Sequence, residues 1–172
     1  MKDWISVDIE TSGLNPCVHE TIEVGMCWAD GTTDAFSLAF DESKASSRAL
    51  EVNGWGKRDF APLRGKTDVL VTLDRAFSTG AMLVASPAHF DVGFLEQLFR
   101  REEINPPWNH RSIIDIKSYA VGQLALLTNL KNAEIARLFD LEPLDKDYEH
   151  SALNDAVWQA ELFRCLLGWT HP

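Results

Sequence analysis

The chain has 172 residues and a formal net charge of −10, with 45% hydrophobic and 24% charged residues. This composition is typical of a globular protein, and the length suits one domain with a full core, so we expect a single domain over residues 1–172. The acidic charge argues against a protein that coats long nucleic acid through a broad basic surface.

The sequence carries no signal for export or membrane insertion. It has no run of about 20 apolar residues, and its start, MKDWISVDIE, lacks the apolar core of a secretory signal. Cys17, Cys27 and Cys165 are odd in number and form no CxxC pair, so they indicate neither a disulfide framework nor a zinc knuckle. We therefore expect a soluble protein of the cytoplasm.

Hydrophobic periodicity predicts strands and helices in an order typical of an α/β protein. Three strands come first without helices between them, which favours an antiparallel meander. The later strands are separated by helices, which favours parallel additions to a mixed sheet flanked by helices. The predicted strands are 4–10, 20–29, 33–40, 82–86 and 111–115, and the predicted helices are 46–53, 67–79, 90–103, 116–127, 131–139 and 151–167.

The first predicted strand carries two carboxylates, Asp8 and Glu10, in the segment VDIETSGL. Side chains alternate along a strand, so both carboxylates point to the same face. Adjacent carboxylates repel each other unless a cation or a proton lies between them, and oxygen ligands suit Mg²⁺ or Mn²⁺ better than zinc. The pair indicates a divalent metal site, although an isolated DxE is more often a strand end with two solvated acids.

Asp91 follows the apolar strand 82–86, in the segment AHFDVGFLEQLF. Apolar residues recur there at helical spacing, which places Asp91 in the first turn of a helix. Taken alone, it fits a structural role beside the helix dipole as well as it fits a metal ligand.

The segment EHSALNDA places His150 just before the last predicted helix and Asp155 about one turn inside it, with Ser151 as a plausible N-cap. Imidazole exchanges protons near neutral pH, so a histidine in this position suits a general base. Taken alone, a histidine at a helix start is more often a surface residue.

The three motifs together resemble the DEDDh family of 3′-to-5′ exonucleases, small phage or bacterial members included. They are DxET followed by SGLNP, FDxxFL after a strand, and HxAxxDA near the C-terminus, and the resemblance runs from about Trp4 to Leu167. It implies an RNase H-like fold, a mixed five-stranded sheet flanked by α-helices. It also implies hydrolysis of single-stranded nucleic acid from the 3′ end, with release of nucleoside 5′-monophosphates.

The resemblance also assigns roles to residues. Four carboxylates would hold two Mg²⁺ or Mn²⁺ ions, which activate water and stabilise the leaving oxygen, and a histidine would be the general base. The terminal nucleotide would meet the segment after DxE. One departure, Ser86-Pro87 where many relatives carry His-Asn, affects the expected contact with sugar or phosphate. The residues concerned are Asp8, Glu10, Asp91 and Asp155 for metal, His150 for the base, and Thr11, Gly13 and Leu14 for substrate.

Several alternatives stay open. No residue in the sequence indicates a contact with the 2′-hydroxyl of RNA, so DNA is favoured only slightly as the substrate. The alternative is an exoribonuclease of the RNase T or oligoribonuclease type. A non-catalytic nucleic-acid or polymerase-binding module would be expected to lose a catalytic position, and a phosphatase of small nucleotides would need a closed pocket. The C-terminal LLGW segment, 166–169, could form a homodimer, but we favour a role in the core. Candidate basic or stacking contacts, each of which fits a solvated loop equally well, are Lys57, Arg58, Arg64, Lys66, Trp108, His110 and Arg111.

Overall fold

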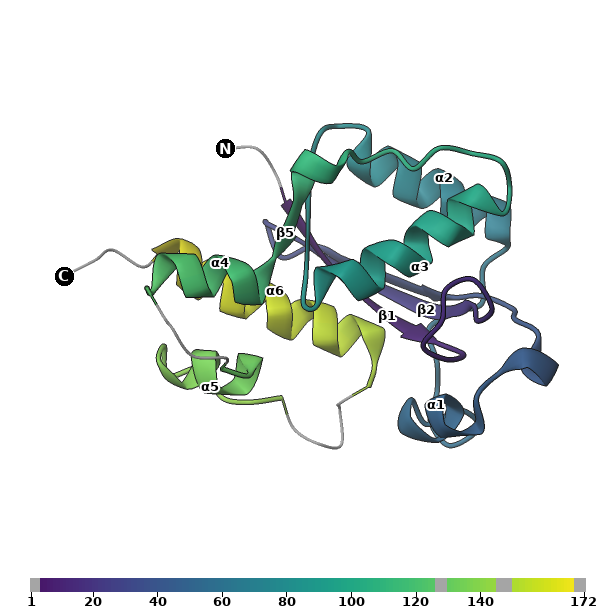
Figure 1. Ribbon diagram of the computed structural model, residues 1–172, viewed down its shortest axis with the longest axis horizontal. Helices are drawn as coiled ribbons and strands as arrows, with labels where there is room; N and C mark the ends of the chain where they lie inside the picture. The colour runs from purple at the N-terminus through teal and green to yellow at the C-terminus, as the bar shows by residue number, and fades with distance from the viewer. Residues whose placement is uncertain (1–3, 126–129, 145–149, 169–172) are drawn as a thin grey trace.

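The computed structural model describes residues 4–125, 130–144 and 150–168. Five strands form one sheet in the order β3-β2-β1-β4-β5 (Figure 1). β1 (Trp4–Thr11) is antiparallel to β2 (Thr21–Trp28), which is antiparallel to β3 (Thr33–Ser37). β4 (Met82–Ala85) and β5 (Ile113–Asp115) extend the sheet in parallel. The predicted mixed sheet is therefore confirmed.

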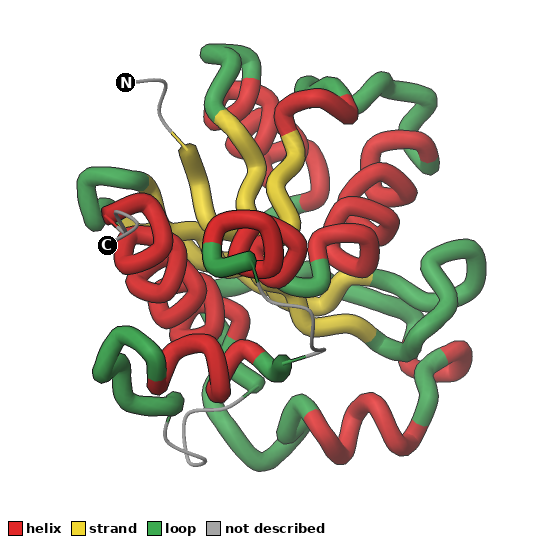
Figure 2. Tube along the Cα trace, turned by 60° about the vertical axis from the view of Figure 1, so that its left-hand side comes forward, coloured by secondary structure: helices red, strands yellow, loops and turns green. Residues whose placement is uncertain are grey.

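Helices cover both faces of this sheet, as Figure 2 shows from a second direction. α2 and α3 lie on one face, and α4 and α6 lie on the other with α5 beside them (Figure 1). The helices are α1 (Ser47–Val52), α2 (Lys66–Phe77), α3 (Ala88–Arg100), α4 (Ile116–Gln123), α5 (Asn132–Arg137) and α6 (Ala152–Gly168), with short 3₁₀ helices at Glu42–Lys44 and His110–Ser112.

Most element boundaries differ from the predicted ones by one to four residues, as at the end of α3, which lies at Arg100 rather than at residue 103. The third strand ends at Ser37 rather than at residue 40, and Ser37 also forms a bridge with Leu63. The fifth strand begins at Ile113, after a 3₁₀ helix. α4 ends at Gln123, before Ala125 adopts a left-handed φ of 50° that no helix can continue. Residues 126 and 127 of the predicted helix 116–127 lie outside the described residues.

The alternation of β1 separates an apolar face from a polar one. Ile5, Val7 and Ile9 pack into the core beneath α2 and α3. The other side chains of β1, which include Asp8 and Glu10, point toward the face that α6 covers. The polar face of β1 is therefore covered by a helix. An ion or a hydrogen-bond partner must offset the cost of burying its polar side chains.

The start of α6 lies unusually close to β2. A Cβ atom on Gly25 would collide with the backbone of Ala152 and Leu153, so glycine is needed for this approach. Because Gly25 pairs with Asp8 in the sheet, the close approach brings the first turns of α6 over the carboxylates of β1.

Three further expectations from the sequence concern the C-terminal segment, the cysteines and membrane insertion. Leu166 is fully buried, as the preferred core role predicts, while Leu167 is 46% exposed and Trp169 lies outside the described residues. Cys17, Cys27 and Cys165 are free thiols. None of the described helices is both long enough and apolar enough to cross a membrane.

Candidate active site

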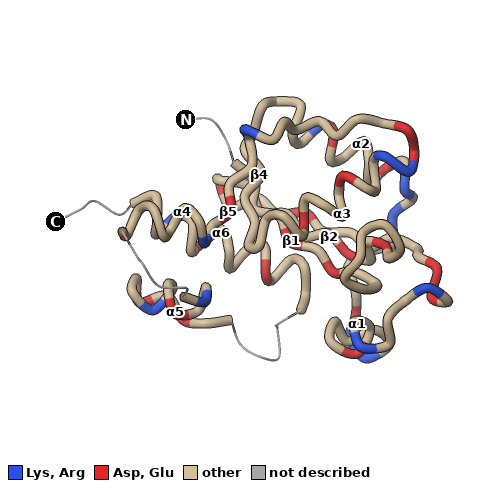
Figure 3. Tube along the Cα trace, viewed as in Figure 1, with Lys and Arg blue, Asp and Glu red and all other residues tan. Residues whose placement is uncertain are grey.

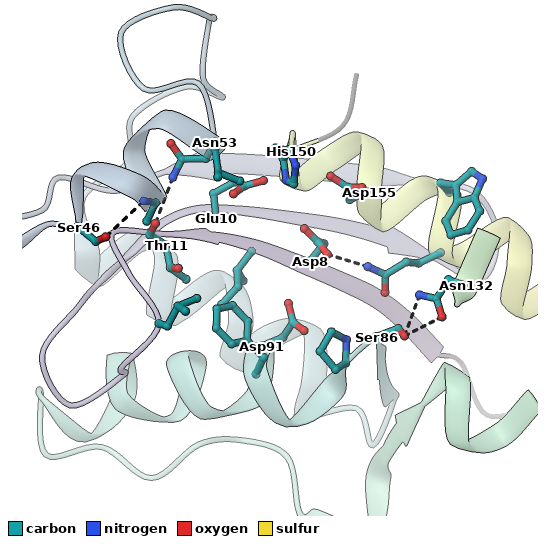
Figure 4. A pocket seen from close by; sticks show the side chains of 18 of the residues that line it. Asp8, Glu10, Thr11, Ser46, Asn53, Ser86, Asp91, Asn132, His150 and Asp155 are labelled. Carbon is teal, nitrogen blue, oxygen red and sulfur yellow. Dashed lines mark hydrogen bonds between the residues drawn. The ribbon is translucent and has the colours of Figure 1, made fainter. Parts of the chain in front are cut away.

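A pocket of about 550 Å³ opens where β1 meets the first turns of α3 and α6 (Figure 4). Its volume falls within the range of small-molecule sites, about 300–1,000 Å³. The residues that line it are Asp8, Ile9, Glu10, Thr11, Leu14, Ser46, Arg48, Ala49, Val52, Asn53, Ser86, Pro87, Phe90, Asp91, Asn132, His150, Asp155, Trp158 and Gln159.

Four carboxylates from three distant segments face this pocket. One oxygen each from Asp8, Glu10 and Asp155 lie within 4.8 Å of one another. Asp91 lines the same pocket from the first turn of α3, and Figure 4 shows it below Asp8. Figure 3 shows acidic positions gathered near the middle of the molecule, around β1 and α3, with basic positions on α1 and α5. The structure thus brings together all four carboxylates singled out in the sequence.

The carboxylates are too crowded and too buried to ionise freely. Burial raises the pKa of Glu10 to about 8, and repulsion from Asp155 acts in the same direction. Burial likewise raises the pKa of Asp91 to about 8. The pKa of Asp8 is raised well above its ordinary value by burial and then by repulsion from the other three carboxylates. A divalent cation would relieve both effects, so the donor set fits Mg²⁺ or Mn²⁺.

His150 is exposed at the rim of the pocket, beside Glu10 and Asp155 (Figure 4). Its backbone has a φ of 64°, in the left-handed region, and α6 begins two residues later. The first intrahelical hydrogen bond runs from the N–H of Asp155 to the carbonyl of Ser151, at 2.9 Å. This sharp entry to the helix leaves the imidazole facing the pocket while Asp155 lies one turn inside.

Apolar side chains form part of the pocket wall. Leu14 is 80% exposed although it is large and apolar, and it lines the pocket together with Phe90 and Trp158. Thr11 also lines the pocket, where its hydroxyl donates to the carbonyl of Gly13 at 2.8 Å. Gly13 itself is not part of the lining. Its role in this structure is steric, because a Cβ there would collide with the ring of His19.

Three side-chain amides in the pocket were not singled out in the sequence. The Nε2 of Gln159 donates to Asp8 at 2.7 Å. The Nδ2 of Asn53 donates to the carbonyl of Thr11 at 3.1 Å, which ties the end of α1 to β1. Asn132 exchanges hydrogen bonds with Ser86, the residue that stands where many DEDDh relatives carry histidine. An amide therefore reaches this part of the pocket from α5, a different segment of the chain.

The basic and aromatic contacts considered in the sequence do not line this pocket. Arg58, Arg64 and Lys66 form ion pairs with Glu23, Asp34 and Glu102 respectively. The stacking role considered for Trp108 is wrong, because the indole is only 8% exposed and packs edge-on against Phe77 and Phe99 in the core.

Known proteins resemble the chain across most of its length. The model of the exonuclease family RNase T matches residues 5–163. The 3′-5′ DNA exonuclease Cap18 of Escherichia coli is 28% identical, over 95% of this chain and 90% of that protein. Ribonuclease T of Buchnera aphidicola is 26% identical, over 92% of this chain and 80% of that protein.

Solved structures share the fold. The nuclease domain of 3′hExo, a DEDDh family member bound to rAMP, has a TM-score of 0.75 at 15% identity, over 96% of this chain and 92% of that one. E. coli exonuclease I in complex with a dT13 oligonucleotide has a TM-score of 0.73 at 15% identity, over 98% of this chain and 41% of that one. This chain thus spans about two fifths of exonuclease I. The likeness in fold confirms the RNase H-like architecture. Because the family model covers nearly all of its length, the chain belongs to the exonuclease family, as its resemblance to the DEDDh 3′-to-5′ exonucleases predicts.

Proposed function

We propose that this exonuclease removes nucleotides one at a time from the 3′ end of single-stranded DNA, with two divalent ions and His150 as general base. The observation that carries the proposal is the convergence of Asp8, Glu10 and Asp155 within 4.8 Å in a pocket with an exposed histidine at its rim. We also propose that one catalytic domain accounts for this activity, as the family match over residues 5–163 supports.

The metal ligands in this proposal are the four carboxylates of the pocket, Asp8, Glu10, Asp91 and Asp155. When bound, two divalent ions would supply positive charge to the phosphate and to the attacking and leaving oxygens. Magnesium or manganese suits these oxygen ligands, which come without a cysteine or a second histidine among the described lining residues.

His150 is proposed to accept a proton from the attacking water at a ring nitrogen. The water oxygen attacks the phosphorus that joins the last two nucleotides, the bond from phosphorus to the 3′ oxygen breaks, and that oxygen takes a proton from solvent. The products are a nucleoside 5′-monophosphate and a chain one nucleotide shorter. Exposure at the rim suits this role, because an exposed imidazole can return its proton to solvent after each cycle.

The apolar wall is proposed to hold the terminal nucleotide. Leu14 and Phe90 offer apolar surface on which a base can pack, and bases stack on aromatic side chains whatever their sequence. A pocket that grips one end needs few phosphate contacts, so the net charge of −10 is compatible with this substrate.

The proposed preference for DNA is supported by the similarity to Cap18, a DNA exonuclease. The second candidate, an exoribonuclease, is favoured by the similarity to ribonuclease T. A DNA and an RNA oligonucleotide of one sequence, each labelled at its 5′ end, would be digested in parallel with Mg²⁺ or Mn²⁺. A larger kcat/KM on DNA supports the proposal, and a larger kcat/KM on RNA replaces it with the second candidate.

A further inference from the structure

Gln159 lies beneath the proposed metal site and contacts one of its carboxylates. Its Nε2 donates a hydrogen bond of 2.7 Å to Oδ1 of Asp8, although the two lie 151 positions apart in the chain. Among the described residues, Gln159 is the side chain that hydrogen bonds to this carboxylate. Gln159 belongs to α6 and lies one helical turn after Asp155, so it shares a face with that ligand.

The carbonyl oxygen of the Gln159 side chain accepts no hydrogen bond from the described residues. The side chain is only 4% exposed, and this oxygen, Oε1, is buried. A buried acceptor without a partner costs about 1–3 kcal/mol of stability. An apolar side chain of similar length would fill the same space without this cost. The stability of the fold therefore does not account for an amide at this position.

The hydrogen bond has a consequence for the geometry of Asp8. A carboxylate has about four lone-pair sites, and the amide occupies one of them, so sites for a cation remain. The bond also limits rotation of the carboxylate about its terminal torsion, which is otherwise broad. Fixing a ligand before the ion arrives lowers the entropic cost of binding.

We propose that Gln159 is a positioning residue that orients Asp8 for metal binding, at the expense of stability in the absence of metal. The inference rests on the proposed metal site and adds a residue to it. Side chains that hydrogen bond to metal ligands typically change metal affinity by about 10-fold to 100-fold when they are replaced.

The test is Gln159→Met, which keeps the length of the side chain and removes the donor. Binding of Mn²⁺ alone is measured by isothermal titration calorimetry, and melting is measured in EDTA. We expect Mn²⁺ affinity to fall by about 10-fold to 100-fold while Tm in EDTA stays unchanged or rises. The Mn²⁺ concentration for half-maximal activity should rise, with the KM for the oligonucleotide unchanged.

Ser6→Ala is the matched control. Ser6 in β1 is also buried, its hydroxyl has no hydrogen-bond partner among the described residues, and it lies two residues before Asp8, so its replacement should leave Mn²⁺ affinity unchanged. Equal Mn²⁺ affinity in Gln159→Met and the wild type would overturn the inference, and a lower Tm in EDTA alone would assign Gln159 a purely structural role. If the wild type itself binds no Mn²⁺, the proposed function is wrong. This result differs from one in which the wild type binds Mn²⁺ and Gln159→Met binds it equally well.

Discussion

The carboxylate of Glu23 accepts a hydrogen bond of 3.2 Å from the backbone N–H of Ala152, at the first residue of α6. The same carboxylate pairs with Arg58 at 2.8 Å and accepts the N–H of Ala61 at 2.7 Å. A negative charge is favourable at a helix N-terminus, where backbone N–H groups have no partner within the helix. Glu23 in β2 therefore anchors the helix that carries Asp155.

The close packing of α6 on β2 predicts the effect of Gly25→Ala. The new methyl group would collide with the backbone of Ala152, which cannot move aside as a flexible side chain could. Overpacking of this kind typically costs about 1–3 kcal/mol, and displacement of α6 would also move Asp155. We expect a lower free energy of unfolding in urea, together with weaker Mn²⁺ binding.

Gly122→Ala is the matched control for this substitution. Gly122 lies in α4, where a Cβ would meet no atom of the described residues within 4 Å apart from the backbone of its own helix. Alanine favours a helix by about 1 kcal/mol over glycine, so the control should be slightly stabilised with unchanged metal binding. If both variants show the same stability as the wild type, the packing account of Gly25 is wrong.

Asp155→Ala should abolish nearly all turnover. A divalent ion contributes several kcal/mol of charge stabilisation in the transition state, and about 4 kcal/mol corresponds to roughly 10³-fold in rate. The variant should nonetheless fold, since it loses a carboxylate from a crowded acidic cluster. Rates are measured on labelled DNA beside Asp74→Ala, which replaces an exposed acid on α2. A rate within tenfold of the wild type would exclude Asp155 as a metal ligand.

His150→Ala should separate catalysis from metal binding. Removing a general base typically lowers the rate by about 10²-fold to 10⁴-fold. Because His150 is exposed and outside the carboxylate cluster, both Mn²⁺ affinity and the KM for DNA should stay close to those of the wild type. Single-turnover rates and calorimetry on the same preparation check this. A collapse of DNA affinity would assign His150 to substrate binding instead.

The raised pKa values predict how stability depends on pH. The pKa values of Glu10 and Asp91 are about 8 in the folded protein, because burial disfavours their charged forms. In the unfolded chain both carboxyls lose their protons near pH 4, so between about pH 4 and pH 8 the folded state holds more protons. The free energy of unfolding in EDTA should therefore fall as pH rises through this window.

Magnesium should reverse this trend, because an ion binds the deprotonated carboxylates and is displaced by protons. Thermal melts at about pH 6 and about pH 9, in EDTA and in excess Mg²⁺, measure the effect. Glu10→Gln should flatten the dependence in EDTA. A Tm in EDTA that does not fall between these two pH values would contradict the account of buried, mutually repelling carboxyls.

Leu14→Ala should weaken substrate binding without affecting the fold. Leu14 is 80% exposed, so its truncation removes little buried surface, but it takes apolar area from the pocket wall. We expect a KM several-fold higher with kcat and Tm nearly unchanged, since truncating a contact residue commonly costs about 1 kcal/mol. Leu63→Ala, at a 70% exposed position outside this pocket, should change neither constant. Equal KM values for the two variants would remove Leu14 from the substrate site.

Most of the fold could be predicted from the sequence, because the hydrophobic periodicity of each segment agrees with the place of that segment in the sheet or in the helices around it. Strand alternation placed Asp8 and Glu10 on one face, and helical spacing placed Asp91 and Asp155 in first turns. The order of strands and helices then required a mixed sheet. The ends of elements were less predictable, as at Ser37, where the third strand ends although the apolar residues 38–40 follow it.

The residues that sequence analysis missed depend on contacts between distant segments. A glutamine in an amphipathic helix ordinarily faces solvent, and only the close approach of α6 to β1 turns Gln159 toward Asp8. Glu23 is a buried carboxylate whose partners come from two other segments, which no local pattern indicates. Trp108 follows a helix in a polar segment, and its burial is set by Phe77 and Phe99 across the core.

The carboxylate pocket is proposed to be the metal-dependent exonuclease site. The most direct test is a time course on single-stranded DNA labelled at its 5′ end, with Mg²⁺, Mn²⁺ or EDTA, for the wild type and Asp8→Ala. We expect a ladder that shortens from the 3′ end with either metal, and no ladder in EDTA or in the variant. Equal cleavage by Asp8→Ala, or cleavage that persists in EDTA, would contradict this proposal.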